Sequence, residues 1–401
     1  MTRRQITILL ILFLIVVGVI AYAIFFRGGV VPLEQAAPTE QPATGEIQGT
    51  TGTTGTTPTE NGTAQTTTPP TTFPPAAGAG DTYVLKKLSD GPVVGYWTSK
   101  NSNDVYYLTN DGYVMSAKEG PDTDVLKQEV KGVMRLEGSP SGSKALVAFG
   151  NAASPQWAVF DAQDKAWRPL PSNVITATWG ISDDGVVATT RAAGNNVALT
   201  YITLSKTPYD IKTIVKDFRF NSVTFAIKSI DELYIMERPS SLAQSHVWLL
   251  NLKTNALTQV LNPANGLTLV PGSNNDVLFR FYSPNNFAIL NRSLSMAQPF
   301  PYITLPQKCD GTSAAAYCFI PKNNSLFSSG NSMPDDYLMK KIYTSDDLYR
   351  LDLTTGGDRL ILSGDSSNAP ALDAQNVRTR GTSTYFINRY DNYVYAVQKT
   401  Q

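Results

Sequence analysis

The fold is decided by a stretch that reads VMRLEG (133–138), SPSGS (139–143) and KALVAF (144–149), followed by QWAVFDA (156–162) and WRPLP (167–171). It holds four short apolar runs, and the first two are joined by the Ser, Pro and Gly residues that tight turns favour. Apolar and polar residues alternate in the third run, which predicts a strand with one buried face. We therefore expect the order strand, turn, strand, loop, strand, turn, strand.

The same strand order recurs along the chain at a spacing of about 40 to 50 residues. Including the first, seven copies span 95–119, 133–170, 174–216, 222–261, 267–293, 346–363 and 377–399. A blade of four strands cannot bury both of its faces alone, so it stacks against its copies around an axis. We therefore predict an all-β fold, a seven-bladed β-propeller. A pair of β-sandwiches is the alternative, because it also has strands with regular turn signals.

The two ends of the repeat complement each other. The stretch TYVLKKLSDGP (82–92) has the character of an outermost strand, whereas the last copy lacks such a strand after YVYAVQK (393–399). We therefore expect residues 83–89 to complete the final blade. This pairing would close the ring without a covalent bond.

Several motifs carry a resemblance to a known family. SPSGSK (139–144) and WGISDDG (179–185) resemble the W-S-P-D-G-K turn of TolB-like, WD40-like (PD40) β-propellers. LKKLSDGPVVG (85–95) and YFINRYDNYVYAV (385–397) resemble membrane-anchored propellers of candidate-phylum bacteria. The cysteine-containing copy departs from this pattern, because it reads DGTS (310–313) without the Trp. The resemblance implies a propeller and an N-terminal anchor, but no particular activity.

The N-terminal region has the pattern of a membrane anchor. Residues 6–26 are uncharged and apolar, and a helix of this length, at about 1.5 Å rise per residue, spans roughly the 30 Å of the hydrocarbon core. Arg3 and Arg4 precede the run, so the positive-inside rule places residues 1–5 in the cytoplasm and the later chain outside. We predict a single-pass helix in the cytoplasmic membrane. A signal peptide cleaved after Ala21-Tyr22-Ala23 is the alternative.

A linker is predicted between this helix and the repeats. Residues 27–80 are rich in Thr, Pro and Gly and have few large apolar side chains. Such a segment cannot offset the entropy that it would lose on folding, so we expect it to be disordered. A flexible coil of this length has ends roughly 40 Å apart. The propeller domain is then expected to occupy residues 81–401.

The composition excludes several classes of function. Lys and Arg number 33, as do Asp and Glu, so the chain lacks the basic excess of a nucleic-acid binder. The one histidine, His246, lies in an apparent strand and is predicted at a surface or loop edge; no G-x-S-x-G motif accompanies it. The sequence therefore predicts no catalytic, cofactor-binding or metal-binding residue, and no cofactor.

Cys309 and Cys318 are the two cysteines of the chain, and the eight residues between them have the character of a hairpin turn. Adjacent antiparallel strands would bring their Cα atoms within reach of a disulfide, and export supplies an oxidising compartment. A structural disulfide is predicted. A reduced buried pair is one alternative, and a redox or metal role is another, although two cysteines without a nearby histidine do not complete a zinc site.

An insertion in the sixth copy is a candidate binding surface. Residues 322–341 are long for a hairpin loop, and loops of this length are often functional. They mix apolar side chains with polar ones, as partner surfaces do, and the candidates are Phe327, Met333, Tyr337 and Leu338. The alternative is that the insertion simply packs over the propeller.

Propellers also bind ligands at the mouth of the central channel, where Arg135 and Arg378 are candidates. The expected function is that of a membrane-tethered, extracytoplasmic module that binds or scaffolds an unknown envelope protein or polysaccharide. The alternative is a hydrolase or lyase that acts on envelope polysaccharide or peptide. That alternative requires at least two converging, partly buried Asp or Glu side chains in the channel.

Overall fold

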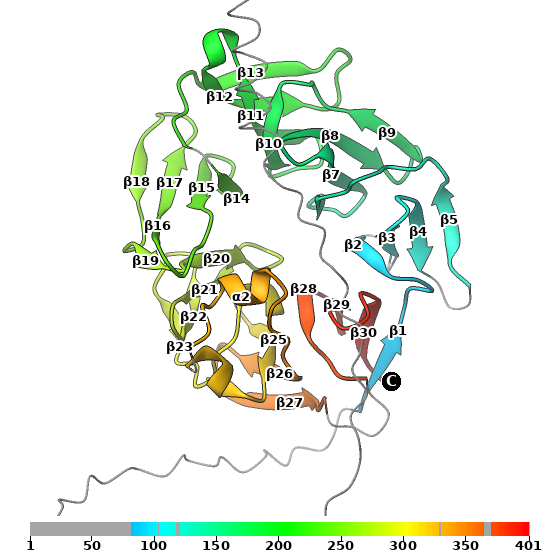
Figure 1. The fold of residues 1–401 in the computed structure, drawn as a ribbon, viewed down its shortest axis with the longest axis vertical. Coiled ribbons are helices and arrows are strands. Elements are labelled where there is room, and N and C mark those ends of the chain that lie inside the picture. The colour runs from blue at the N-terminus through cyan, green and yellow to red at the C-terminus, as the bar shows by residue number, and fades with distance from the viewer. Residues whose placement is uncertain are drawn as a thin grey trace, which may run out of the picture. The chain divides into compact units, whose positions relative to one another are not determined.

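The computed structural model describes residues 82–400 except 101, 103, 118–120, 221, 329 and 365–369. This part of the chain forms seven four-stranded antiparallel sheets, arranged as blades in a ring (Figure 1). The predicted seven-bladed β-propeller is confirmed, and the sandwich alternative is wrong. The helix predicted at 6–26 and the linker predicted at 27–80 lie outside the described residues. Within the described residues, no helix is long and apolar enough to cross a membrane.

In the first six blades the strands pair in chain order from one edge of the sheet to the other. Blade 1 contains β2 (Val93–Thr98), β3 (Val105–Thr109), β4 (Val114–Ala117) and β5 (Thr123–Leu126). Blade 2 contains β6 (Arg135–Gly138), β7 (Lys144–Asn151), β8 (Ser154–Asp161) and β9 (Ala166–Pro169). Blade 3 contains β10 (Val174–Trp179), β11 (Gly185–Arg191), β12 (Val197–Thr203) and β13 (Asp210–Val215).

Blade 4 contains β14 (Val223–Ser229), β15 (Glu232–Glu237), β17 (Val247–Asn251) and β18 (Leu257–Gln259). Blade 5 contains β20 (Thr268–Pro271), β21 (Val277–Tyr282), β22 (Asn286–Asn291) and β23 (Met296–Gln298). Blade 6 contains β24 (Cys309–Gly311), β25 (Ala315–Pro321), β26 (Asp346–Asp352) and β27 (Asp358–Leu362). The remaining short elements are β16 (Gln244–Ser245), which pairs with β19 (Ala264–Asn265), the 3-10 turns η1 (Ala193–Asn195), η2 (Pro306–Lys308) and η3 (Asn324–Phe327), and the helix α2 (Asp335–Leu338).

Blade 7 joins the two ends of the described chain. Its strands β28 (Ala374–Arg380), β29 (Ser383–Asn388) and β30 (Val394–Lys399) are completed by β1 (Tyr83–Lys87), which pairs antiparallel with β30. Tyr83 lies opposite Lys399, and Lys87 lies opposite Tyr395. The predicted closure of the ring by the N-terminal strand is confirmed.

The core is divided among the contacts between neighbouring blades. Each of seven buried apolar clusters in the described residues joins one blade to the next. In β8, Trp157 and Val159 pack toward blade 3, whereas Phe160 packs toward blade 1. The predicted packing of one face on a neighbouring blade is confirmed, and the other face is buried as well, because a blade inside a closed ring has a neighbour on both sides.

The Ser- and Gly-containing turn of blade 2 contacts the blades on both sides of it. Gly142 has a φ of +75°, and a Cβ there would lie 1.9 Å from the carbonyl oxygen of Thr98, so only glycine fits. The backbone N–H of Ser141 donates to Oδ1 of Asp183 at 3.0 Å, and the Ser143 hydroxyl donates to Oδ2 of Asp183 at 2.6 Å. Burial acts to raise the pKa of Asp183, but these hydrogen bonds outweigh it and hold that pKa below its usual range.

The two cysteines form the predicted disulfide. Cys309 in β24 lies opposite Cys318 in β25, with a Cα–Cα distance of 4.2 Å. Both sulfur-bearing side chains are buried between blades 5 and 6. The disulfide therefore links the first two strands of blade 6, as the short hairpin between the cysteines predicted.

Candidate functional site

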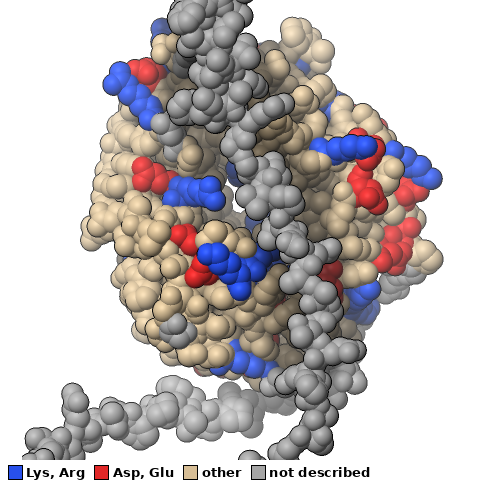
Figure 2. Space-filling model, in the orientation of Figure 1, with Lys and Arg blue, Asp and Glu red and all other residues tan. Residues whose placement is uncertain are grey.

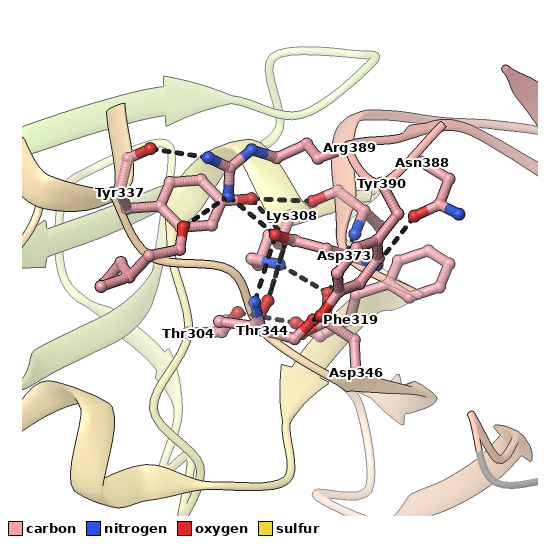
Figure 3. A network of polar contacts seen from close by, with 12 residues as sticks. Thr304, Lys308, Phe319, Tyr337, Thr344, Asp346, Asp373, Asn388, Arg389 and Tyr390 are labelled. Carbon is pink, nitrogen blue, oxygen red and sulfur yellow. Dashed lines mark hydrogen bonds and ion pairs between the residues drawn. The ribbon is translucent and has the colours of Figure 1, made fainter. Parts of the chain in front are cut away.

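A lysine is buried where blades 6 and 7 meet. Lys308, the last residue of η2, is 0% exposed. Its Nζ lies 2.5 Å from Oδ2 of Asp346 and 2.7 Å from Oδ1 of Asp373, and it donates to the Thr344 hydroxyl at 2.8 Å (Figure 3). Asp346 begins β26, and Asp373 directly precedes β28. An ammonium group out of contact with water requires partners of this kind, so Lys308 connects the two blades.

A second cation completes this network. Arg389 follows β29, and its Nη1 lies 2.8 Å from Oδ2 of Asp373 while its Nη2 donates to the carbonyl oxygen of Tyr337 at 2.8 Å. The Tyr337 hydroxyl donates to Asp373 at 2.8 Å, and its ring centroid lies 3.7 Å from Arg389 and 4.9 Å from Lys308. Two cations thus balance two carboxylates, and α2 is fastened to blade 7 through Tyr337 (Figure 3).

The pKa shifts follow from burial and pairing. Burial acts to lower the pKa of Lys308, but the carboxylates outweigh it and raise that pKa above its usual value. Burial acts to raise the pKa of Asp373, but Lys308 and Arg389 hold it below its usual range. Burial raises the pKa of Asp346. Lys308 and both carboxylates are 0% exposed, so these three side chains are out of contact with solvent and hold Tyr337 and Arg389 in place.

A cavity of about 210 Å³ lies directly beside the network. Residues from four places line it, namely η2, the segment around α2, the start of β28 and the residue after β29. Its lining consists of Gln307, Tyr337, Leu338, Lys340, Gln375, Asn376 and Arg389. Charged side chains gather on this face over α2 (Figure 2). Three of these seven residues carry side-chain amides, and Tyr337 and Arg389, which the network holds in place, also line the cavity.

One amide in this lining lacks a partner. Nε2 of Gln307 is buried and makes no hydrogen bond to any described residue. A buried unpaired donor costs free energy, on the order of 1 to 3 kcal/mol, unless something else accepts its hydrogen bond. The cavity is smaller than the roughly 300 to 1,000 Å³ of pockets that hold whole drug-sized ligands. It has room for one sugar ring or one side chain of a larger molecule.

The insertion itself is mostly core. Phe327, Met333 and Tyr337 are 1%, 0% and 2% exposed and pack with Phe281 of β21. These three side chains are therefore buried, because the insertion folds back onto blade 5, as the packing alternative expects. That any of them contacts a partner stays a prediction, and Tyr337 also lines the cavity. Leu338 is 52% exposed and lines the cavity, so its role as a contact residue stays a prediction.

The other candidate side chains differ in how their charge is compensated. Arg135 in β6 pairs with Glu137 at 2.9 Å. Arg378 in β28 has no ion pair within the described chain and donates to the carbonyl oxygen of Val377 at 3.2 Å. His246 lies between β16 and β17, 2.8 Å from Glu237, with a side chain that is 32% exposed. The predicted surface or loop-edge placement of this histidine is confirmed.

The enzyme alternative required converging, partly buried carboxylates. Asp346 and Asp373 do converge, but both are fully buried and both are held by Lys308. This pair is therefore closed to a substrate. No group of three or more His, Cys, Asp or Glu side chains within the described ranges could hold a metal ion.

Sequence reasoning missed Lys308, Asp346, Asp373 and Arg389. In the sequence Asp346 belongs to the acidic pair Asp346-Asp347, and such pairs are typical of turns and strand starts. The one local signal for Lys308 is its position next to Cys309, which is predicted to form a disulfide. Lysine is normally exposed, however, and only the partners distant in sequence reveal its burial.

The fold and site define a propeller with a cavity beside an insertion. No protein-family model and no curated protein matches the chain in sequence. Solved structures that are similar to it include an oligogalacturonate lyase from Vibrio parahaemolyticus, with 8% identity, a TM-score of 0.53, and coverage of 79% of this chain and 97% of that one.

An uncharacterised protein from Listeria monocytogenes is also similar, with 12% identity, a TM-score of 0.50, and coverage of 77% of this chain and 90% of that one. TolB from Acinetobacter baumannii matches with 7% identity and a TM-score of 0.34 over 79% of this chain and 66% of that one. At these identities the first two likenesses support the propeller fold alone.

Proposed function

We propose that the chain is a binding module of the cell envelope, and that the cavity beside α2 binds one sugar unit of an envelope polysaccharide. The observation that carries this proposal is the cavity lining, in which three residues, Gln307, Gln375 and Asn376, carry side-chain amides. Amides both donate and accept hydrogen bonds, as sugar hydroxyls do, so Gln307, Gln375 and Asn376 can bind several hydroxyls of one ring. The volume of about 210 Å³ fits a single ring and leaves the rest of the polymer outside.

The rigid floor supports this role. Tyr337 and Arg389 are 2% and 3% exposed and are each fixed by hydrogen bonds to Asp373. A site whose supporting side chains are already ordered loses less entropy when it binds. We therefore expect binding without rearrangement of blade 7.

The proposed location comes from the sequence. The apolar run at 6–26 after Arg3 and Arg4 supports a location outside the cytoplasmic membrane, with residues 27–80 as the tether. Fusions of alkaline phosphatase after residue 80 should be active, and fusions of a cytoplasmic reporter should not. The reverse pattern would refute the location.

The ligand is tested by occluding the cavity. The full-length protein is applied to an array of defined uncharged oligosaccharides, beside the variants Leu338→Trp and Leu257→Trp. Leu338 lines the cavity, whereas Leu257 is 44% exposed on β18 and serves as the matched control. Binding that is lost in Leu338→Trp alone supports the proposal. Absence of any oligosaccharide binding, or equal loss in both variants, refutes it.

A further inference from the structure

A second polar feature lies where the innermost strands of blades 7 and 1 meet. Arg378 and Arg380 are two residues apart on β28, so they share a face of that strand. Nε of Arg380 donates to the hydroxyl of Thr98, the last residue of β2, at 3.2 Å. Lys100 follows β2, and its backbone N–H donates to the carbonyl oxygen of Ser141 at 2.7 Å. The arginines thus lie where blades 7 and 1 meet, and Lys100 lies at the next contact, between blades 1 and 2, where Arg380 acts on it electrostatically.

The two guanidinium groups keep most of their donors unused. A guanidinium carries five N–H donors. In the described part of the chain Arg378 donates one hydrogen bond, to Val377, and Arg380 donates one, to Thr98. Both side chains are partly buried, yet neither forms an ion pair with a described carboxylate, in contrast to Arg135, whose guanidinium lies 2.9 Å from Glu137.

Two carboxylates act electrostatically on these cations. Asp310 acts on Arg380, and Asp183 acts on Lys100. Both carboxylates already accept hydrogen bonds from uncharged backbone and hydroxyl groups. Asp310 accepts backbone N–H groups of Ser273 at 2.7 Å and Thr379 at 2.5 Å, and the Ser273 hydroxyl also donates to it. Asp183 accepts hydrogen bonds from the turn of blade 2. Three cations against two carboxylates leave one positive charge in excess.

Burial and mutual repulsion disfavour this arrangement without an anion. Burial lowers the pKa of Arg380; Asp310 opposes this shift, and the positive charge of Arg378 adds to it. Burial lowers the pKa of Lys100, and Arg380 lowers it further. A negative group placed between these side chains would relieve the repulsion and accept the unused hydrogen bonds.

We propose that Arg378, Arg380 and Lys100 bind an oxyanion, a carboxylate or phosphate group of a ligand that enters the centre of the ring. The planar fork of a guanidinium matches both groups in bidentate geometry. This site is separate from the cavity beside α2 and does not depend on the sugar proposed there. The strand β28 carries both, with Gln375 and Asn376 near its start and the arginines near its end.

The test is calorimetric titration of the full-length chain with citrate and with pyrophosphate, which carry the two kinds of group. Arg378→Gln/Arg380→Gln should weaken binding at least about tenfold for each arginine lost. The control Lys212→Gln/Lys216→Gln also removes two positive charges, but from exposed positions around β13, and should bind as the wild type does. Binding should also weaken as salt is raised.

Thermal unfolding with and without each anion provides a second measurement. The anion that binds should raise the melting temperature of the wild type and not that of the arginine variant. If the double variant does not fold, the single variant Arg380→Gln is compared with the wild type instead. A tighter complex with citrate assigns a carboxylate ligand, and a tighter complex with pyrophosphate assigns a phosphate. Wild-type protein that binds neither anion, or an equal loss in the lysine control, overturns the proposal.

Discussion

Replacing Lys308 by Met should strongly destabilise the propeller. The substitution keeps the volume of the side chain and removes its contacts with Asp346 at 2.5 Å, Asp373 at 2.7 Å and Thr344 at 2.8 Å. Asp373 keeps Arg389 as a partner at 2.8 Å. Asp346 keeps only the backbone N–H of Ala374 at 2.9 Å, while its Oδ1 already has no partner among the described residues.

Most of the lost stability should therefore come from Asp346, whose charge stays buried without a cation. Removing one partner of a buried ion pair costs about 3 to 5 kcal/mol, because the remaining charge stays buried without compensation. The matched control is Lys206→Met, which breaks an exposed pair with Asp210 at 2.7 Å, and such pairs contribute about 0 to 1 kcal/mol. The two substitutions delete the same charge and differ in burial.

Urea unfolding, followed by the fluorescence of the buried Trp97, Trp157 and Trp179, measures both changes. The double variant Lys308→Met/Asp346→Leu should recover much of the lost stability, since apolar replacement of a whole buried pair is often neutral. The reasoning would be refuted if Lys308→Met cost no more than Lys206→Met. It would also fail if the double variant were as unstable as the single one.

Three further outcomes are expected. The pKa of Lys308 is raised in the folded state, so its contribution to stability is complete below about pH 10.4 and is lost as the pH rises toward the folded pKa. Above about pH 10.4 the urea midpoint should therefore fall more steeply with pH in the wild type than in Lys308→Met. Parallel curves for the two proteins would contradict this. Cys309→Ser/Cys318→Ser should lower the free energy of unfolding by about 2.5 to 3 kcal/mol in the same urea assay under oxidising conditions, and the loss should vanish in reductant. Deleting residues 1–87 removes β1, so it should expose the edge of β30 and produce soluble aggregates on size-exclusion chromatography. Deleting residues 1–80 keeps β1 and should leave the protein monomeric. A monomeric 88–401 protein would show that the pairing of β1 with β30 is dispensable.

The blades could be predicted from the sequence because their signals are local. The turn SPSGS (139–143) carries the glycine that a φ of +75° requires, and the cysteines are close along the chain and face each other across one hairpin. The complementary ends of the repeat likewise predicted the pairing of β1 with β30.

The site could not be predicted in this way because its contacts join distant parts of the chain. Lys308 meets Asp346 and Asp373, which are 38 and 65 residues away, and apart from the neighbouring Cys309 the local sequence does not mark it as buried. Tyr337 lies in a polar stretch and looks exposed, yet it is placed between two cations by the return of the insertion onto the ring. Local patterns determined the strands, and packing between blades determined which charges met.

The pairing of β1 with β30 also affects how the protein is made. The Thr400 hydroxyl donates to the carbonyl oxygen of Thr82, 318 residues earlier, so the first strand of the domain finds its neighbours only after the last has been synthesised. During translation the first six blades can form before blade 7 is complete. Until then β1 stays unpaired and can pair with the edge of another strand instead. We expect a late, slow step in folding that joins the earliest and latest strands to emerge from the ribosome.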